Sequence, residues 1–199
     1  MLALQGDVRE HAAMLREVGA SVVEVRKPEH LKDLDGLVIP GGESSVIDKL
    51  TRIFSLRDPL IAAINAGLPV FGTCAGLILL AQDVEDKIVG QLTLGGLDVT
   101  VRRNAFGSQV DSFEAVVDVQ GISGPGILVA FIRAPTVTRV GPGVTPIATL
   151  GDGTVVGVRS GNLVGVSFHP EITGDDRLHR LFVALVIEAD FRAKASLPA

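Results

Sequence analysis

The sequence has no tryptophan or tyrosine, and Cys74 is its only cysteine in 199 residues. A lone cysteine cannot form an internal disulfide; this agrees with a reducing compartment, and we expect a cytoplasmic protein. Long apolar runs are also missing, so the sequence predicts neither a signal peptide after Met1 nor a membrane span. Basic residues are fewer than acidic ones, 18 against 23, for a net charge of −5. Because no basic cluster is interleaved with aromatic residues, we expect no nucleic-acid partner and no membrane partner.

What the sequence does have is 47% hydrophobic and 21% charged residues, enough for one compact domain over residues 1–199. Patterns typical of strands (2–5, 21–25, 36–39, from 70) alternate with patterns typical of helices (8–18, after 44, 59–66). This alternation predicts an α/β fold with a three-layer, doubly wound, mostly parallel sheet, whose sites lie at the carboxyl ends of strands. Short β segments follow at 97–101, 113–119, 127–132, 147–150 and 155–159, then a strand at 163–168 and a helix from about 175. We expect the short segments to extend the sheet or to form an antiparallel flap.

Cys74 stands in Phe71-Gly72-Thr73-Cys74-Ala75-Gly76, directly after an apolar run. A strand that breaks at Gly72 and turns at once into a helix presents its cysteine on a tight bend. The unpaired N–H groups of the helix start favour the thiolate, which is the nucleophilic form. The alternative is a buried, inert cysteine, which is the commoner case for a lone cysteine.

His169 and Glu171 follow a second apolar strand, in Phe168-His169-Pro170-Glu171. Pro170 favours extended geometry at His169, and in an extended segment residues two apart project to the same side. Glu171 would then accept the Nδ1–H of His169 and leave Nε2 free to exchange a proton with a nucleophile. The alternative is a surface turn.

A third strand runs into Pro40-Gly41-Gly42-Glu43-Ser44. Glycines let the backbone approach a ligand closely, so the N–H groups of Gly42 and Ala75 are candidates for an oxyanion hole. The alternatives are a phosphate-binding loop or a strand-to-helix turn with Ser44 as N-cap. A Walker-type loop is excluded because no Gly-Lys-Ser/Thr follows.

These three motifs, in this order, resemble the triad glutamine amidotransferases, which use Cys, His and Glu. Within that class the chain is most similar to the glutaminase subunits of pyridoxal 5′-phosphate synthases, over nearly its whole length. The strings that carry this likeness are Leu2-Ala3-Leu4-Gln5-Gly6-Asp7, residues 40–45, Arg103-Asn104-Ala105-Phe106-Gly107 with Gln109, Ser112-Phe113-Glu114, and Phe131-Ile132-Arg133-Ala134-Pro135. The resemblance implies a flavodoxin-like class I glutamine amidotransferase fold with added short β segments.

The resemblance also implies roles for individual residues: Cys74 as nucleophile, His169 as base and Glu171 as the acid that orients it. It implies that glutamine is held by Gly42, Glu43, Ser44, Arg103, Ile132 and Arg133. A guanidinium can grip the α-carboxylate of glutamine through two hydrogen bonds, but the sequence does not say which arginine does so. The alternatives are a solvated charge for Arg103 and a structural salt bridge for Arg133. No metal and no cofactor is expected.

The expected reaction is hydrolysis of L-glutamine to glutamate and ammonia through a γ-glutamyl thioester. The resemblance implies that ammonia passes to a partner, the lyase-type subunit of the synthase, which is a (β/α)₈ barrel. We therefore expect low glutaminase activity alone and stimulation by the partner, through rearrangement of the Gly41-Gly42 peptide. Two other hypotheses are a γ-glutamyl hydrolase or thiol peptidase on the same fold, and a non-catalytic regulatory module. Hydrolysis of poly-γ-glutamate would favour the first, and trapping of Cys74 by a glutamine analogue would exclude the second.

Overall fold

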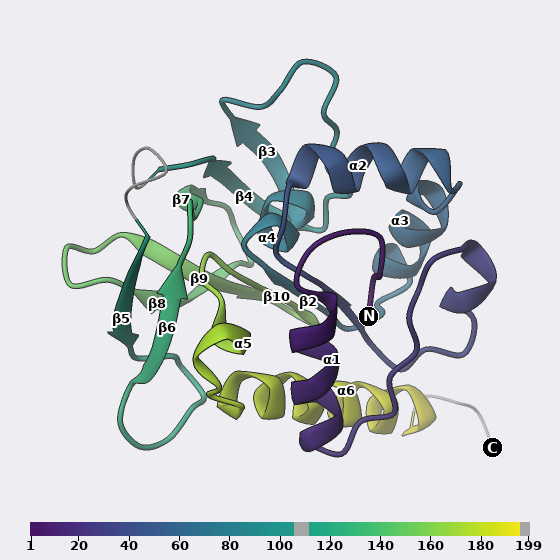
Figure 1. Cartoon of the computed structure of the whole chain (residues 1–199). Coiled ribbons are helices and arrows are strands. Elements are labelled where there is room, and N and C mark those ends of the chain that lie inside the picture. Colours follow the sequence, from purple (N-terminus) through teal and green to yellow (C-terminus); the bar gives the residue numbers. More distant parts are fainter. Residues whose placement is uncertain (106–111, 196–199) are drawn as a thin grey trace.

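The computed structural model describes residues 1–105 and 112–195 (Figure 1). Phe106, Gly107 and Gln109 of the motif that begins at Arg103 lie outside the described residues. The main sheet has eight strands in the order β1-β2-β10-β9-β7-β4-β3, with β8 paired to β9. Its strands are β1 (Leu37–Ile39), β2 (Val70–Thr73), β3 (Ala81–Glu85), β4 (Leu97–Arg102), β7 (Thr136–Val140), β8 (Thr145–Thr149), β9 (Val155–Ser160) and β10 (Leu163–Val166).

Helices cover both faces of this sheet (Figure 1). One face carries α1 (Val8–Glu17) and α6 (Arg177–Ala195), and the other carries α2 (Ser44–Ile53), α3 (Arg57–Asn65) and α4 (Ala75–Leu80). A 3₁₀ helix (Pro28–Leu31) and the short α5 (Pro170–Thr173) complete the helices of the described residues. The α/β class predicted from the alternating patterns is therefore confirmed.

Each face of the sheet has its own hydrophobic core. One core joins α2, α3 and α4 to the sheet through residues such as Ile47, Leu60 and Leu77. The other joins α1 and α6 to the sheet through Leu15, Phe71 and Phe182. Because both faces are covered, β2 and β10 are buried at every residue, as is typical of strands in the middle of a doubly wound sheet.

The parallel strands β1, β2 and β10 lie side by side, with Ile39 paired to Gly72 and Val166 paired to Thr73. The short β segments make up most of the antiparallel part, although β4 also pairs in parallel with β3. β7, β8 and β9 join the main sheet. β5 (Phe113–Val117) and β6 (Ile127–Phe131) form a separate hairpin (Figure 1). Both expected arrangements, an extended sheet and an antiparallel flap, therefore occur.

The strands expected at residues 2–5 and 21–25 were wrong in extent. Only an isolated parallel bridge joins Leu2 to Val25, although Leu2 N also donates to Val38 O at 2.9 Å. The ladder stops there because the chain bends at residues 4–7. Two strands had not been predicted, β3 and β7, because each mixes exposed polar positions with only two buried ones. Among the described residues, no helix combines the length and apolar character needed to cross a bilayer.

Candidate active site

Four chain segments meet at the edge of the sheet where β1, β2 and β10 end. Because these strands are parallel, their carboxyl ends point to the same edge. Gly41 and Gly42 follow β1, Cys74 follows β2, and His169 follows β10. The fourth segment is the bend after Leu2, which carries Asp7 to the same place.

Cys74 lies on the sharp turn between β2 and α4. Its backbone is in an unusual conformation for a non-glycine residue, with φ 47° and ψ −100°, and its N–H donates to Val166 O at 2.8 Å. Such conformations cost about 1–3 kcal/mol and collect at functional sites. Gly76 has no room for a side chain, because a Cβ would collide with Ile39 O. The turn is thus packed directly against β1. Cys74 is 6% exposed, and its sulfur lies 4.0 Å from Ile132 O.

His169 is buried beside this turn and is fixed at both backbone and ring. Its N–H donates to Ala130 O at 2.8 Å, which joins it to the β5–β6 hairpin. Its Nδ1 lies 2.8 Å from Glu171 Oε1. The extended geometry expected for His169 is found, with φ −114° and ψ 91°. The expectation that Glu171 continues the extended segment was wrong. Pro170 begins α5, since a proline suits the first position of a helix, and Glu171 reaches the ring from that first turn.

The charges of this pair are mutually stabilised. Burial disfavours the charged form of His169, but Asp7, Cys74 and Glu171 outweigh it and raise its pKa to about 12. Burial likewise disfavours the Glu171 carboxylate, yet hydrogen bonds from His11 and His169 lower its pKa to about 2. His169 is therefore an imidazolium at neutral pH. A positive ring next to Cys74 stabilises the thiolate.

Behind Glu171 lies a buried chain of polar groups that sequence reasoning had not assigned to the site. His11 Nε2 contacts Thr73 Oγ1 at 2.9 Å and Glu171 Oε1 at 3.3 Å. His11 Nδ1 in turn contacts His179 Nε2 at 2.9 Å. Burial, and after it the electrostatic influence of His11, lowers the pKa of His179 to about 4, so the His179 ring is neutral at pH 7. In the sequence, the one available sign of this chain was His11, which lies on the apolar stripe of α1. A histidine in that position could equally have been a core residue.

The predicted substrate residues and the sulfur share one cavity of about 30 Å³. It is lined by Gly42, Glu43, Ser44, Cys74, Ile78, Arg103, Asn104, Ile132 and Arg133. A single water needs about 10–15 Å³ by this measure, so the cavity has room for about two or three water molecules. Two larger hollows, of about 470 and 440 Å³, have no lining residue in common with it. The structure thus brings every predicted substrate residue next to Cys74, around a small cavity.

The two arginines of this cavity differ in their partners. Arg103 is not a solvated charge, since its side chain is 9% exposed and donates to Glu43 Oε1 at 2.9 Å and to Gln91 Oε1 at 3.1 Å. Gln91 also donates to Ser44 Oγ at 2.9 Å. Arg133 is exposed, has φ 46°, and has no ion-pair partner among residues 1–105 and 112–195. The structural salt bridge considered for Arg133 is therefore not present among the described residues.

The two candidate oxyanion groups come from the segments that follow β2 and β1. Ala75 is the first residue of α4, where backbone N–H groups have no acceptor within the helix. Gly42 has φ 145°, and the next N–H, of Glu43, donates to Gln5 Oε1 at 2.8 Å. Glu43 rather than Ser44 caps α2, through Ser45 N at 3.4 Å. The Gly41-Gly42 segment is thus tied to the bend that carries Gln5.

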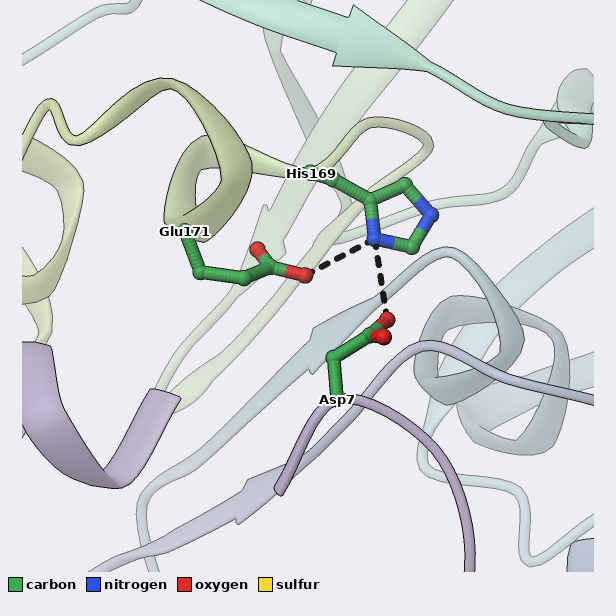
Figure 2. A group of neighbouring side chains, drawn as sticks. All are labelled: Asp7, His169 and Glu171. Carbon is green, nitrogen blue, oxygen red and sulfur yellow. Dashed lines mark hydrogen bonds and ion pairs between the residues drawn. The ribbon is translucent and has the colours of Figure 1, made fainter. Parts of the chain in front are cut away.

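Figure 2 shows Asp7, His169 and Glu171, whose ligand-type atoms all lie within 4.8 Å of one another. With the pKa of His169 raised to about 12, Nδ1 carries a proton and offers no lone pair to a cation.

Comparison with known proteins shows the family to which the chain belongs. The model of the SNO glutamine amidotransferase family matches residues 1–188. The chain is 59% identical over 186 residues to the pyridoxal 5′-phosphate synthase subunit PdxT of a Parafrankia species, covering 94% of this chain and 91% of the relative. It is 57% identical over 189 residues to the PdxT subunit of Clavibacter sepedonicus, covering 95% and 90%. A crystal structure of a glutamine amidotransferase superposes with a TM-score of 0.86 at 47% identity, covering 93% and 96% of the two chains. A putative GMP synthase subunit from Thermoplasma acidophilum, at 19% identity and TM-score 0.69, shares the fold over 97% and 96%.

Proposed function

Because this chain belongs to the SNO glutamine amidotransferase family, we propose that it is the glutaminase subunit of a pyridoxal 5′-phosphate synthase. It hydrolyses L-glutamine to L-glutamate and ammonia, and it delivers the ammonia to a partner synthase subunit. The relatives that carry this subunit name cover almost the whole chain, and the chain covers almost all of each of them. For the partner, the sequence resemblance favours a (β/α)₈ barrel.

In the proposed reaction the Cys74 thiolate attacks the side-chain amide carbon of glutamine. The oxygen gains negative charge and is held by the N–H groups of Gly42 and Ala75, a contribution of about 3 kcal/mol for each donor. His169 then gives its Nε2 proton to the leaving amine, which departs as ammonia and leaves a γ-glutamyl thioester. The ring, now neutral, takes a proton from water while that water attacks the thioester carbon. Glutamate leaves and the thiolate–imidazolium pair is restored.

Substrate binding is assigned to the residues around the sulfur. Arg133 is the better candidate for the α-carboxylate of glutamine, because Arg103 already has Glu43 and Gln91 as partners. Arg103 then serves to hold Glu43 and, through Gln91, Ser44 in place. Ile132 and Gly42 also line this cavity, and glycine can do so only with its backbone.

The observation that carries this proposal is the shared cavity, in which Cys74 meets residues that follow β1, β4 and β6. Its volume of about 30 Å³ also supports dependence on the partner. Glutamine is larger than a space for about two or three water molecules, so the segments that carry Glu43 and Ile132 have to move apart for it to lie fully inside the cavity. We propose that binding of the partner favours the open arrangement and turns the Gly41-Gly42 peptide toward the substrate.

The test is a glutaminase assay on the full chain, with and without the partner synthase subunit. We expect slow release of glutamate and ammonia alone, faster release with the partner, and no release from Cys74→Ala under either condition. Covalent trapping of Cys74 by an electrophilic glutamine analogue would support the thioester route. Equal rates with and without the partner would contradict partner control. Cleavage of poly-γ-glutamate in place of glutamine would overturn the proposal in favour of a γ-glutamyl hydrolase.

A further inference from the structure

The Nδ1 of His169 faces two carboxylates, although one is enough to orient a catalytic histidine. Glu171 Oε1 lies at 2.8 Å and Asp7 Oδ2 at 3.3 Å, on different sides of the same N–H (Figure 2). The two acids differ in environment. The side chain of Glu171 is fully buried, whereas that of Asp7 is 32% exposed.

The position of Asp7 is fixed by the fold. Its N–H donates to Gly41 O at 3.2 Å, which ties the bend before α1 to the glycine segment after β1. Its carbonyl oxygen accepts from His11 N at 3.2 Å, which ties it to the first turn of α1. Asp7 therefore contacts both the histidine ring and the proposed oxyanion segment.

Asp7 is also the N-cap residue of α1, yet its side chain makes no capping hydrogen bond. Aspartate is among the preferred N-cap residues, and the cap is worth about 0.5–2 kcal/mol. At this position the carboxylate is turned to His169 instead. Stability that the helix could have gained is given up in favour of a contact with the ring, which indicates a role at the site.

We propose that Asp7 is a positioning residue that shares the Nδ1–H of His169 with Glu171, orienting the ring and stabilising its protonated form. This inference rests on the proposed function. An imidazolium is needed twice in the reaction, before the proton passes to ammonia and after the ring has taken a proton from water. A second carboxylate favours it at both steps.

The surroundings of His169 support this role. The titratable groups that face the ring are Asp7 before α1, Cys74 after β2 and Glu171 in α5. His11 of α1 stands behind Glu171, and His179 of α6 stands behind His11. Against the lowering effect of burial, Asp7 is the largest influence that raises the pKa of His169.

The first test measures the protonation of the His169 ring without using the glutaminase reaction. Because Cys74 is the only cysteine, its alkylation by iodoacetamide as a function of pH reports the thiolate and its neighbouring imidazolium directly. At high pH the alkylation rate changes where the imidazolium of His169 loses its proton. In Asp7→Asn this transition should move down by about one pH unit, because an opposite charge at this distance shifts a pKa by about 1–3 units. Asp58→Asn, which removes an exposed aspartate in the first turn of α3, is the matched control and should leave the profile unchanged.

The second test asks whether the two carboxylates share one task. In the full chain with its partner subunit, Asp7→Asn by itself should lower kcat less than about tenfold, because Glu171 still holds the ring. In the Glu171→Gln background the same change should cost more than about tenfold, since coupled residues depart from additivity. Asp7→Glu should recover part of the loss.

An equal effect of Asp7→Asn in both backgrounds, with an unchanged alkylation profile, would overturn the inference. If the alkylation profile shifts while no glutamine is hydrolysed, the role of Asp7 stands and the proposed substrate fails.

Discussion

Gly41→Ala tests the geometry around His169 with the smallest possible change. A Cβ at Gly41 would lie 2.9 Å from His169 Nδ1 and 2.8 Å from Asp7 Oδ2, and closer still to His169 Cε1. The backbone of Gly41 does not have a positive φ, so alanine brings no strain of its own. The peptide cannot simply move away, because Gly41 O accepts from Asp7 N at 3.2 Å. The added methyl group therefore has to displace the ring.

The size of the effect follows from these contacts. Carbon atoms prefer a separation of about 3.5–4.0 Å, so the ring has to shift by about 1 Å. Crowding of this kind costs about 1–3 kcal/mol of stability. A misplacement of about 1 Å can cost about 100-fold in rate. We expect kcat/KM to fall about 100-fold and Tm to fall by about 2–12 °C, at about 2–4 °C per kcal/mol for a chain of this size.

Thermal unfolding of the chain, together with glutaminase kinetics in the presence of the partner, would measure both quantities. Gly151→Ala is the matched control, because a Cβ there has no atom within 4 Å and its φ is ordinary. It should change neither value. If Gly41→Ala keeps full activity and full stability, the ring of His169 does not face Gly41 in the working enzyme, and the reasoning fails.

Three further changes have effects that the structure predicts. The carboxylate of Glu171, with its pKa lowered from 4.5 to about 2, contributes stability that is present above pH 4.5 and lost as the pH falls toward 2. At 1.36 kcal/mol per pKa unit this is about 3 kcal/mol, so urea unfolding of Glu171→Gln at pH 7 and pH 3 should show a weaker pH dependence than the wild type. Phe71 is fully buried against the rings of His11, His179 and Phe182, and Phe71→Ala should lower the free energy of unfolding in urea by about 3–5 kcal/mol. Arg133→Ala should raise KM for glutamine about tenfold or more with little change in kcat, since a hydrogen bond to a charged group is worth about 1.5–3 kcal/mol, and an unchanged KM would move the α-carboxylate to Arg103.

The sequence predicted the fold where strands are fully buried. Val70–Thr73 and Leu163–Val166 are short, mainly apolar segments, each followed by a motif. Both are buried central strands that lead into a proposed functional residue. The edge of the sheet near Leu2 was harder to predict from the sequence. Leu2 has the apolar neighbours of a strand, but the bend after it leaves a single bridge, and this depends on where Val25 and Val38 lie in space.

The site was predicted where residues next to each other in the sequence carry the chemistry. Cys74, His169 and Glu171 belong to short motifs, so their types and order could be read directly. Asp7 and His179 could not be found in this way, because nothing local distinguishes an N-cap aspartate that makes no cap or a histidine buried in a helix. Their contacts exist only once α1 and α6 pack on the same face of the sheet.

The place of β10 in the sheet has a consequence for how the protein is made. This strand inserts between β2 and β9, so the imidazole reaches the sulfur only after nearly all of the chain has left the ribosome. Until then the cysteine lacks its proposed base. A truncated polypeptide that ends before β10 would therefore carry the nucleophile without the histidine, and it should hydrolyse no glutamine.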